Sequence, residues 1–230
     1  MAITPGDVAL IVGAGPGFSG AVARRLKAGG ARVALASRRA DAALAADLGA
    51  AAYPFDAGDP ARTQDLFARV EADLGAPSFV MYNPSARVRG PLATLDPAAV
   101  ARAIEVTAYG AFLVAQEAVK RMQPAGRGHV LLTGATASVK GMAQSAAFAM
   151  GKFALRGLAQ SMARELHPQG IHVVHVVIDG AIAKPGGAPA EPADSQLDAD
   201  AIAATALALF DQPRSAWTHE VEVRPYVERF

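Results

Sequence analysis

A phenylalanine and a lysine four residues apart indicate a reactive site that lacks a proton donor. Phe148 and Lys152 lie near the start of an apolar run with helical spacing, Phe148 to Leu166. Side chains at positions i and i+4 share one face of a helix, so these two are expected to meet. A lysine amino group can donate hydrogen bonds to a ligand, whereas a phenylalanine ring has no acidic proton. Ligand binding and proton transfer at this site are therefore separate questions.

A glycine-rich loop near the N-terminus predicts a binding site for a pyrophosphate. The strand-like run Val8–Val12 leads into the sequence Gly-Ala-Gly-Pro-Gly-Phe-Ser-Gly, residues 13–20, and a helix is expected over Ala21–Ala28. The N–H groups of such a loop and the dipole of the following helix suit an anion. A tight turn without a ligand is the alternative. The expected contacts with a dinucleotide come from Gly13, Gly15, Gly17 and Phe18.

The end of the second expected strand indicates which dinucleotide binds. This strand ends in Ser37-Arg38-Arg39, with no acidic residue to accept hydrogen bonds from an adenosine ribose. A hydroxyl group beside a guanidinium group suits a 2′-phosphate, because arginine binds phosphate through two parallel hydrogen bonds. Ser37 and Arg38 therefore predict NADP(H) in preference to NAD(H). The alternative is that both arginines are solvated surface charges.

The elements that must position these residues alternate regularly between strand and helix. Asp59-Pro60 and Asp96-Pro97 are typical helix starts, and Gly29-Gly30 and Gly49 are typical helix ends. This alternation predicts an α/β fold, a Rossmann-type doubly wound parallel sheet of about seven strands with helices on both faces, in a single domain over residues 1–230. The expected strands are Val8–Val12, Arg32–Ser37, Ala51–Phe55, Ser78–Tyr82, His129–Thr133, His172–Ile178 and an edge strand within Ala216–Arg224.

One segment, residues 185–200, interrupts this alternation. Its sequence, PGGAPAEPADSQLDAD, is too rich in Pro, Gly, Ala and Asp for a packed element. It follows the sixth strand, where an open α/β sheet binds ligands at its carboxyl edge. A mobile lid over the site is one interpretation and a plain surface loop is the other. The pocket walls are expected from Ser85–Pro91, Ala137–Ser145 and Pro185–Asp200.

Composition excludes several classes of partner. The 230 residues are 52% hydrophobic and 19% charged, with a net charge of +1. This charge gives no case for nucleic acid or for an anionic membrane surface. There is no cysteine, no signal peptide and no uninterrupted apolar stretch of the roughly 20 residues that span a bilayer. The five histidines form no metal-ligand pattern, so no metal site is expected. We expect a cytoplasmic protein that acts on a small molecule.

The motifs resemble the short-chain dehydrogenase/reductase family over essentially the whole chain. The resemblance implies that Lys152 holds the nicotinamide ribose and that the position of Phe148 carries a tyrosine, the general acid or base. It further implies that Asp56 holds the adenine amino group and that Asn83 follows the fourth strand in a changed version of the family's asparagine motif. Gly180 and Ile182, after the sixth strand, are expected beside the cofactor.

At most of the catalytic positions implied by the resemblance, this chain carries a different residue from the family's. The family's active-site asparagine becomes Thr107, and its serine becomes Ala135, or Thr136 after a slip of one residue. The family's third loop glycine falls at Ser19. The proline-glycine pair after the sixth strand becomes Asp179-Gly180, and the threonine that follows becomes Lys184. The chain is therefore expected to be an atypical member that lacks the catalytic tyrosine.

Other groups are candidates for the missing proton donor. The predicted catalytic residues are Lys152, alone or through a water, Thr136, Ser145 and Asp179. Ser145 precedes Lys152 by seven residues, about the spacing of the tyrosine in enoyl-reducing family members, and it is alternatively a helix cap or a hydrogen-bond partner of the substrate. Burial would bring an aspartate such as Asp179 into a useful pKa range.

Two functions remain open. The first is an atypical NADP(H)-dependent oxidoreductase that reduces a carbonyl, an imine or an activated double bond. The second is an NADP(H)-binding protein with little or no turnover, acting as a sensor, scaffold or partner subunit. The resemblance also implies a homodimer or homotetramer, to which apolar outer faces on Val100–Met122 and Phe148–Leu166 would contribute.

Overall fold

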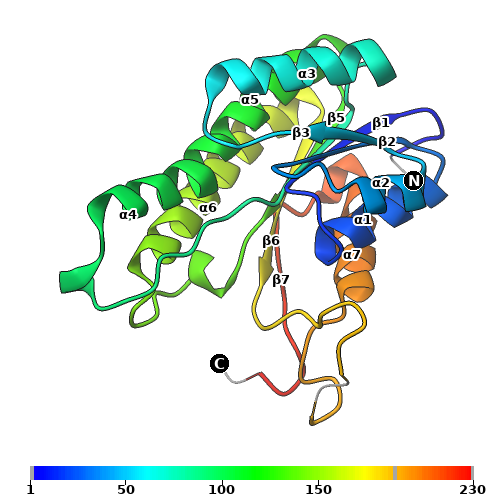
Figure 1. The fold of residues 1–230 in the computed structure, drawn as a ribbon. Coiled ribbons are helices and arrows are strands. Elements are labelled where there is room, and N and C mark those ends of the chain that lie inside the picture. Colours follow the sequence, from blue (N-terminus) through cyan, green and yellow to red (C-terminus); the bar gives the residue numbers. More distant parts are fainter. Residues whose placement is uncertain (1–2, 189–190, 229–230) are drawn as a thin grey trace.

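The fold is built on one parallel sheet. The computed structural model describes residues 3–188 and 191–228. Within them, seven strands lie in the order β3-β2-β1-β4-β5-β6-β7, and every neighbouring pair is parallel (Figure 1). The predicted doubly wound α/β fold is confirmed. The strands are β1 (Val8–Val12), β2 (Arg32–Ser37), β3 (Ala51–Pro54), β4 (Phe79–Tyr82), β5 (Gly128–Thr133), β6 (Ile171–Ile178) and β7 (Glu220–Val223).

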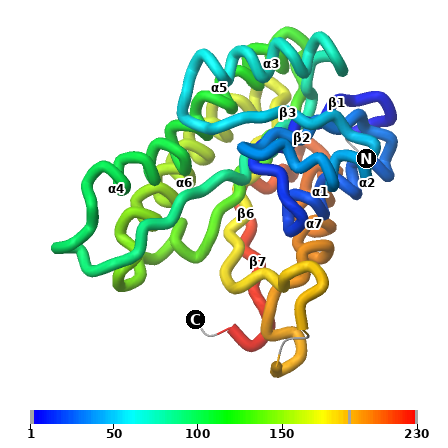
Figure 2. The backbone as a smooth tube through the Cα atoms, in the orientation of Figure 1, coloured from blue at the N-terminus to red at the C-terminus, as the bar shows by residue number. Residues whose placement is uncertain are grey.

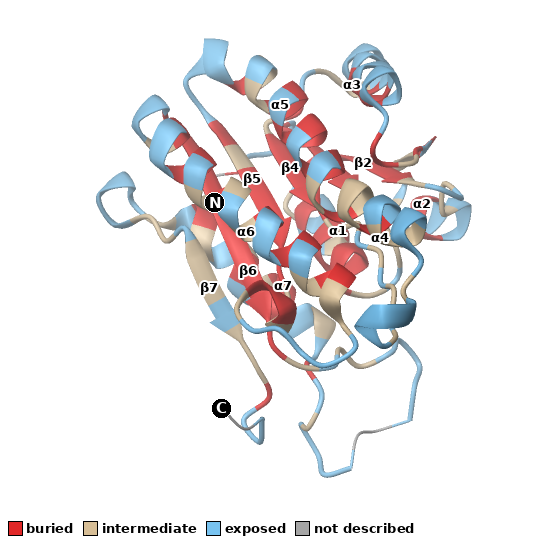
Figure 3. Ribbon diagram, turned by 90° about the vertical axis from the view of Figure 1, so that its left-hand side faces the viewer, coloured by how far each residue is buried: buried red, intermediate tan, exposed pale blue. Residues whose placement is uncertain are grey.

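Helices cover both faces of the sheet. On one face lie α1 (Phe18–Ala28), α2 (Ala42–Leu48) and α7 (Ala199–Ala208). On the other lie α3 (Pro60–Leu74), α5 (Gly110–Met122) and α6 (Ala146–Leu166), and α4 (Pro97–Ile104) extends from α5 alongside α6. Each face has its own apolar core, and the central strands are buried on both sides (Figure 3). Burial on both sides explains why these strands are continuous apolar runs rather than alternating ones.

Local chemistry fixes most of the helix ends. The carboxylates of Asp59 and Asp96 each accept hydrogen bonds from two backbone N–H groups of the first helical turn, as expected of an aspartate before a proline. Gly49 ends α2 in the left-handed conformation, with φ of 54°. One prediction was wrong, because α1 begins at Phe18 rather than Ala21 and so takes in the end of the glycine loop.

The segment predicted as a lid is only partly loop. Leu197 is buried and forms a parallel bridge with Ile182, and α7 begins at Ala199, inside the predicted range. Residues 189 and 190 of that range lie outside the described residues. Figure 2 traces this segment and the C-terminal residues to the same end of the molecule, below β6 and β7. The segment is therefore anchored at its second half by an apolar contact that its composition does not reveal.

The helical run through α4 and α5 passes a test for a membrane span by length and composition. The most apolar 18-residue window of the run Pro97–Ala125 has a mean hydropathy of 1.4. Charged residues such as Arg102 and Glu105 interrupt the run, so it is not the uninterrupted apolar stretch whose absence was expected. Its second half packs into the core through Ala111, Val114 and Ala118. The apolar character of α5 is thus accounted for by contact with the sheet and α3.

A single π-helical turn, Glu105–Tyr109, joins α4 to α5. Such a turn disturbs the regular backbone hydrogen bonds, and it recurs at functional sites. The hydroxyl of Tyr82, at the end of β4, donates a hydrogen bond to the Val106 carbonyl at 2.5 Å. A Cβ at Gly110 would lie 2.5 Å from that hydroxyl, so glycine is required there. The turn and the strand end therefore stabilise each other.

Tyr82→Phe tests this coupling. Removing the hydroxyl leaves the partly buried Val106 carbonyl without this donor, which is expected to lower the free energy of unfolding by about 0.5–2 kcal/mol. Urea denaturation of the variant measures the change. Tyr226→Phe is the matched control, because Tyr226 is 79% exposed and its variant should unfold like the wild type. Equal stability of the two variants would contradict the coupling.

Candidate active site

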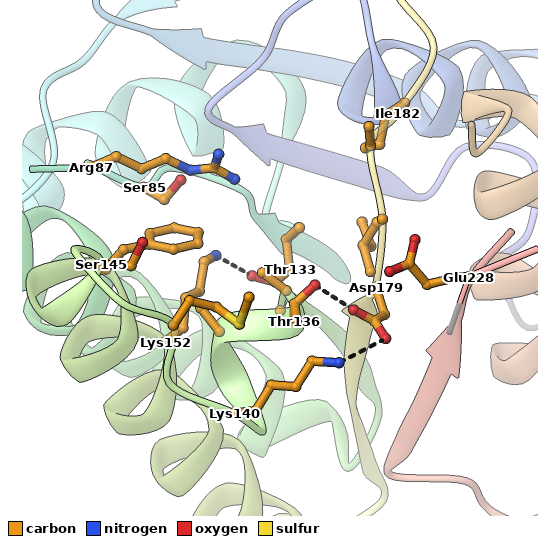
Figure 4. Close-up of a pocket in the computed structure, with 18 of the residues that line it drawn as sticks. Ser85, Arg87, Thr133, Thr136, Lys140, Ser145, Lys152, Asp179, Ile182 and Glu228 are labelled. Atoms are coloured by element: carbon orange, nitrogen blue, oxygen red, sulfur yellow. Dashed lines mark hydrogen bonds and ion pairs between the residues drawn. The ribbon is translucent and has the colours of Figure 1, made fainter. Parts of the chain in front are cut away.

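A pocket of about 680 Å³ opens at the carboxyl edge of the sheet. Its walls come from the segments after β4, β5 and β6, from the start of α6 and from the C-terminal tail (Figure 4). These segments meet because parallel strands end at the same edge. The lining residues are Asn83, Ser85, Arg87, Arg89, Thr133, Gly134, Ala135, Thr136, Ala137, Lys140, Met142, Ser145, Phe148, Lys152, Ile178, Asp179, Gly180, Ala181, Ile182 and Glu228.

Lys152 lies at the base of this pocket. Its side chain is buried, and Nζ donates a hydrogen bond to the Thr133 carbonyl at 2.5 Å. Burial, with a smaller effect from the positive charge of Arg87, lowers the pKa of Lys152 to about 7. Both protonation states are therefore populated near neutral pH, and either can donate hydrogen bonds to a ligand hydroxyl.

Phe148 lies one helical turn before Lys152, and its ring faces the pocket. The guanidinium carbon of Arg87 lies 4.3 Å from the ring centre, and Lys152 Nζ lies 5.9 Å from it. Cations at such distances are attracted to the negative face of an aromatic ring. The predicted meeting of Phe148 and Lys152 is thus present in the structure, with Arg87 as a third member.

Thr136 and Asp179, two of the predicted catalytic residues, lie together. Thr136 Oγ1 donates a hydrogen bond to Asp179 Oδ1 at 2.5 Å. Asp179 Oδ2 lies 3.2 Å from an Arg224 nitrogen and 3.9 Å from Lys140 Nζ. Both carboxylate oxygens of this buried residue therefore have partners. Ala135, the alternative by strict spacing, has no hydroxyl group and also lines the pocket.

Ser145 remains available to a ligand. It occupies the N-cap position of α6, yet its side chain caps no backbone N–H group there. Its side chain lines the pocket (Figure 4). The helix-cap interpretation of Ser145 is therefore wrong for its side chain.

A second pocket of about 530 Å³ continues along the same edge and shares Ser85 with the first. Gly13, Ser37, Arg38 and Asp56 line it, so four of the predicted cofactor contacts converge. Arg39 is absent from the lining. The remaining lining residues are Ala14, Phe55, Ala57, Pro84, Ala86, Arg102 and Val106.

Two glycines of the glycine loop border open space. A Cβ at Gly15 or Gly17 would meet nothing within 4 Å, which leaves open space beside the loop. Gly13, with φ of 79°, must be glycine because a Cβ there would lie 2.7 Å from the Pro84 nitrogen. Ser19, at the third glycine position, accepts a hydrogen bond from the Gly15 N–H at 3.1 Å. This hydrogen bond stabilises the turn, but it occupies the Gly15 N–H group, from which a bound anion would otherwise accept a hydrogen bond.

Other predicted residues have structural partners. The Phe18 side chain is buried in the core, so only its backbone faces the loop. The Asn83 amide donates a hydrogen bond to the Gly13 carbonyl at 3.1 Å and joins the loops after β1 and β4. Asp56 forms an ion pair with Arg102 at 2.9 Å. Thr107, buried on the π-helical turn, accepts a hydrogen bond from the Ala86 N–H at 3.1 Å.

The walls of the first pocket differ in part from the prediction. Ser85–Pro91 and Ala137–Ser145 both contribute, as expected. The described residues of 185–200 do not line it, and Gly180, Ile182 and Glu228 form that wall instead. No sequence pattern points to Glu228, which lines the pocket from the C-terminal tail. Arg87 and Arg89 lay in a predicted wall, but nothing in their spacing distinguished them from surface charges.

A buried serine, a buried histidine and a partly exposed glutamate are linked in a chain of polar contacts. Ser138 Oγ lies 3.4 Å from His175 Nε2, and His175 Nδ1 lies 2.9 Å from Glu220. Glu220 in turn pairs with Arg156 on α6. Ser138 is fully buried and does not line the pocket, so this chain does not act as a nucleophile system. It ties β6, β7 and α6 to the short turn that carries Thr136.

Known sequences similar to this chain include dehydrogenases and reductases. A family model described as short chain dehydrogenase matches residues 7–186. Versicolorin reductase 1 from Aspergillus parasiticus is 32% identical over 186 residues, which are 77% of this chain and 70% of that protein. An inactive 2-(S)-hydroxypropyl-CoM dehydrogenase 2 from Xanthobacter autotrophicus is 30% identical over 199 residues, which are 84% of this chain and 86% of that protein.

Solved structures similar to this chain include proteins of the same class. A short-chain dehydrogenase from Rhodopseudomonas palustris superposes with a TM-score of 0.84 and 30% identity, over 96% of this chain and 99% of that chain. A metagenomic short-chain oxidoreductase in complex with NADP superposes with a TM-score of 0.84 and 26% identity, over 97% of this chain and 99% of that chain.

The low pKa of Lys152 makes a prediction for stability against pH. Unfolding returns this pKa from about 7 to its ordinary value of 10.5, so between these values the unfolded chain binds more protons. The free energy of unfolding should therefore rise with pH there, by at most about 1.4 kcal/mol per unit from this group. Urea denaturation from pH 6 to pH 10 measures the slope.

Lys152→Met should lose this contribution, since methionine does not titrate. Lys27→Met should keep it, because the Lys27 amino group bonds the Gly49 carbonyl at the exposed surface. Parallel stability curves for the wild type and Lys152→Met would contradict a lowered pKa at Lys152.

Proposed function

The chain belongs to the short-chain dehydrogenase family, and we propose that it is an atypical NADP(H)-dependent oxidoreductase. Its substrate is a small molecule with a carbonyl, an imine or an activated double bond. The family's oxidoreductase activity and its use of NAD(P) support the general class. The finer statements, on NADP preference and on the reaction, rest on the residues of this chain.

One observation carries the proposal: two adjoining pockets follow the carboxyl edge of the sheet, with the glycine loop in one and Lys152 in the other. Gly13, Ser37, Arg38 and Asp56 would hold the adenosine half of the cofactor. Lys152, Gly180 and Ile182 would hold the nicotinamide half. When bound, NADPH supplies a hydride for transfer to the substrate. The chain's own contribution is to bind, orient and protonate.

We infer that Lys152 is the proton source in place of a tyrosine. Its amino group lies next to the Phe148 ring, and its pKa of about 7 is matched to proton transfer near neutral pH. Asp179 is a weaker candidate, because both of its oxygens are engaged by Thr136, Lys140 and Arg224. The Ser145 hydroxyl is suited to accept or donate a hydrogen bond to the substrate.

A second candidate function is cofactor binding without turnover, as a sensor, scaffold or partner subunit. Phe148 supplies no proton, and Thr107 is committed to the Ala86 backbone. The relative from Xanthobacter autotrophicus is likewise named an inactive dehydrogenase. These observations support cofactor binding without turnover as the second candidate.

The proposal includes a homodimer or homotetramer and a cytoplasmic location. Tyr109, Phe112, Met150 and Phe153 are exposed apolar residues on the π-helical turn, α5 and α6. An oligomer would cover them, and a one-chain mass by light scattering would contradict this part of the proposal.

Arg38→Asp tests the cofactor preference. An aspartate would repel a 2′-phosphate and accept hydrogen bonds from a ribose, so the ratio of NADP⁺ to NAD⁺ affinity should fall by about tenfold or more. Calorimetric titration of both cofactors gives the ratio. Arg39→Asp is the matched control, since Arg39 does not line the adenosine pocket. The NADP assignment fails if Arg38→Asp leaves the ratio unchanged.

Phe148→Tyr tests whether a phenol at this position, as in the family, makes the site a better catalyst of ketone reduction. With Lys152 in place, the new phenol should raise the rate of ketone reduction by roughly 10²–10⁴-fold. NADPH consumption with ketones, imines and enones is compared for the wild type, Phe148→Tyr and the control Phe148→Leu. An oxidoreductase should consume NADPH with at least one substrate class. Tight NADPH binding without consumption by wild type or Phe148→Tyr would replace the enzyme proposal with the binding one.

A further inference from the structure

The wall of the first pocket that follows β4 carries two arginines, Arg87 and Arg89. Neither forms an ion pair with a carboxylate within residues 3–188 and 191–228. Burial, and then the like charge of Arg89, lowers the pKa of the Arg87 guanidinium. Like charges turned toward one partly buried wall raise its electrostatic free energy, and an anion would relieve this.

The backbone on both sides of these arginines is held in place. The Ala86 N–H donates to Thr107 Oγ1 at 3.1 Å, and the Gly90 N–H donates to the Gln144 carbonyl at 3.2 Å. The Arg87 guanidinium also packs on the Phe148 ring, 4.3 Å from its centre. A guanidinium fixed in this way keeps its N–H groups for a planar, two-oxygen partner such as a carboxylate.

The carboxylates of the pocket lie on the other wall. Asp179 is engaged by Thr136, Lys140 and Arg224. Figure 4 shows Glu228 beside Asp179, and Arg87 across the cavity from both. Asp179 is therefore already neutralised by cations on its own wall, whereas Arg87 and Arg89 line the other wall without a carboxylate partner among the described residues.

We propose that Arg87, assisted by Arg89, binds a carboxylate group of the substrate. The Phe148 ring and Met142 provide apolar surface for the rest of the molecule, so the substrate class is a small carboxylic acid with an apolar body. This inference rests on the proposed function, in which the first pocket holds the substrate. The cofactor's phosphates are the other source of anionic oxygens, but Gly13 and Arg38 line the second pocket.

The test uses benzoate and its uncharged isostere benzamide as probes. Isothermal titration of the protein saturated with NADP⁺ should give benzoate an affinity about tenfold or more above that of benzamide. Arg87→Gln should abolish this preference, and Arg89→Gln should reduce it. Arg87→Lys keeps the positive charge but loses the paired N–H donors of the guanidinium group, so it should retain part of the benzoate preference. Arg164→Gln, at an exposed arginine on α6 whose Nη1 bonds a helix carbonyl, should retain all of it.

Two results would overturn the inference. One is equal affinity of the wild type for benzoate and benzamide. The other is a loss of NADP⁺ affinity in Arg87→Gln with the benzoate preference intact, which would assign Arg87 to a cofactor phosphate. Repeating the benzoate comparison without NADP⁺ separates this inference from the proposed function. Even if the protein binds no NADP⁺, its preference for benzoate over benzamide can still be measured.

Discussion

The buried amino group of Lys152 constrains the rest of the site. Within the described residues it has no carboxylate partner, and its hydrogen bond goes to the Thr133 carbonyl at the end of β5. Desolvation without an opposite charge disfavours the protonated form, which is the physical origin of its low pKa. The strand end must supply an acceptor, and the neighbouring ring of Phe148 must supply a surface that tolerates a cation. Lysine, strand end and ring are therefore one unit.

The remaining charges are arranged around that unit. Asp179, the nearest buried acid in the pocket wall, is held by Thr136, Lys140 and Arg224, away from the Phe148 face. Arg87 packs on the opposite face of the pocket and adds to the shift at Lys152. A site built this way would suit an anionic ligand, and its buried amine is the proton source that we propose. It differs from a dehydrogenase site that has merely lost one hydroxyl group, because the groups around the missing phenol are also changed.

Much of the scaffold could be predicted because it is encoded locally. Strand periods, the glycine loop and the capping aspartates each follow from a few adjacent residues, and the structure has them within a few residues of their expected positions. The partners within the site could not be predicted, since they join distant segments. Arg224 reaches Asp179 from after the last strand, and Tyr82 supports a π-helical turn that no pattern announced. The expectation that residues 185–200 contain no packed element was wrong in part, because Leu197 is buried by tertiary contact in a segment of loop-like composition.

The central claim is that Lys152 is kept to hold a dinucleotide in a site whose acid chemistry has been rebuilt. Calorimetric titration of NADPH into the wild type and Lys152→Met at pH 7.5 tests it most directly. The account predicts one site per chain in the wild type and an affinity lower by about tenfold or more in the variant, the value of a lost hydrogen bond to a charged or strongly polar group. Equal affinity of the two proteins, or no binding by the wild type, would contradict it.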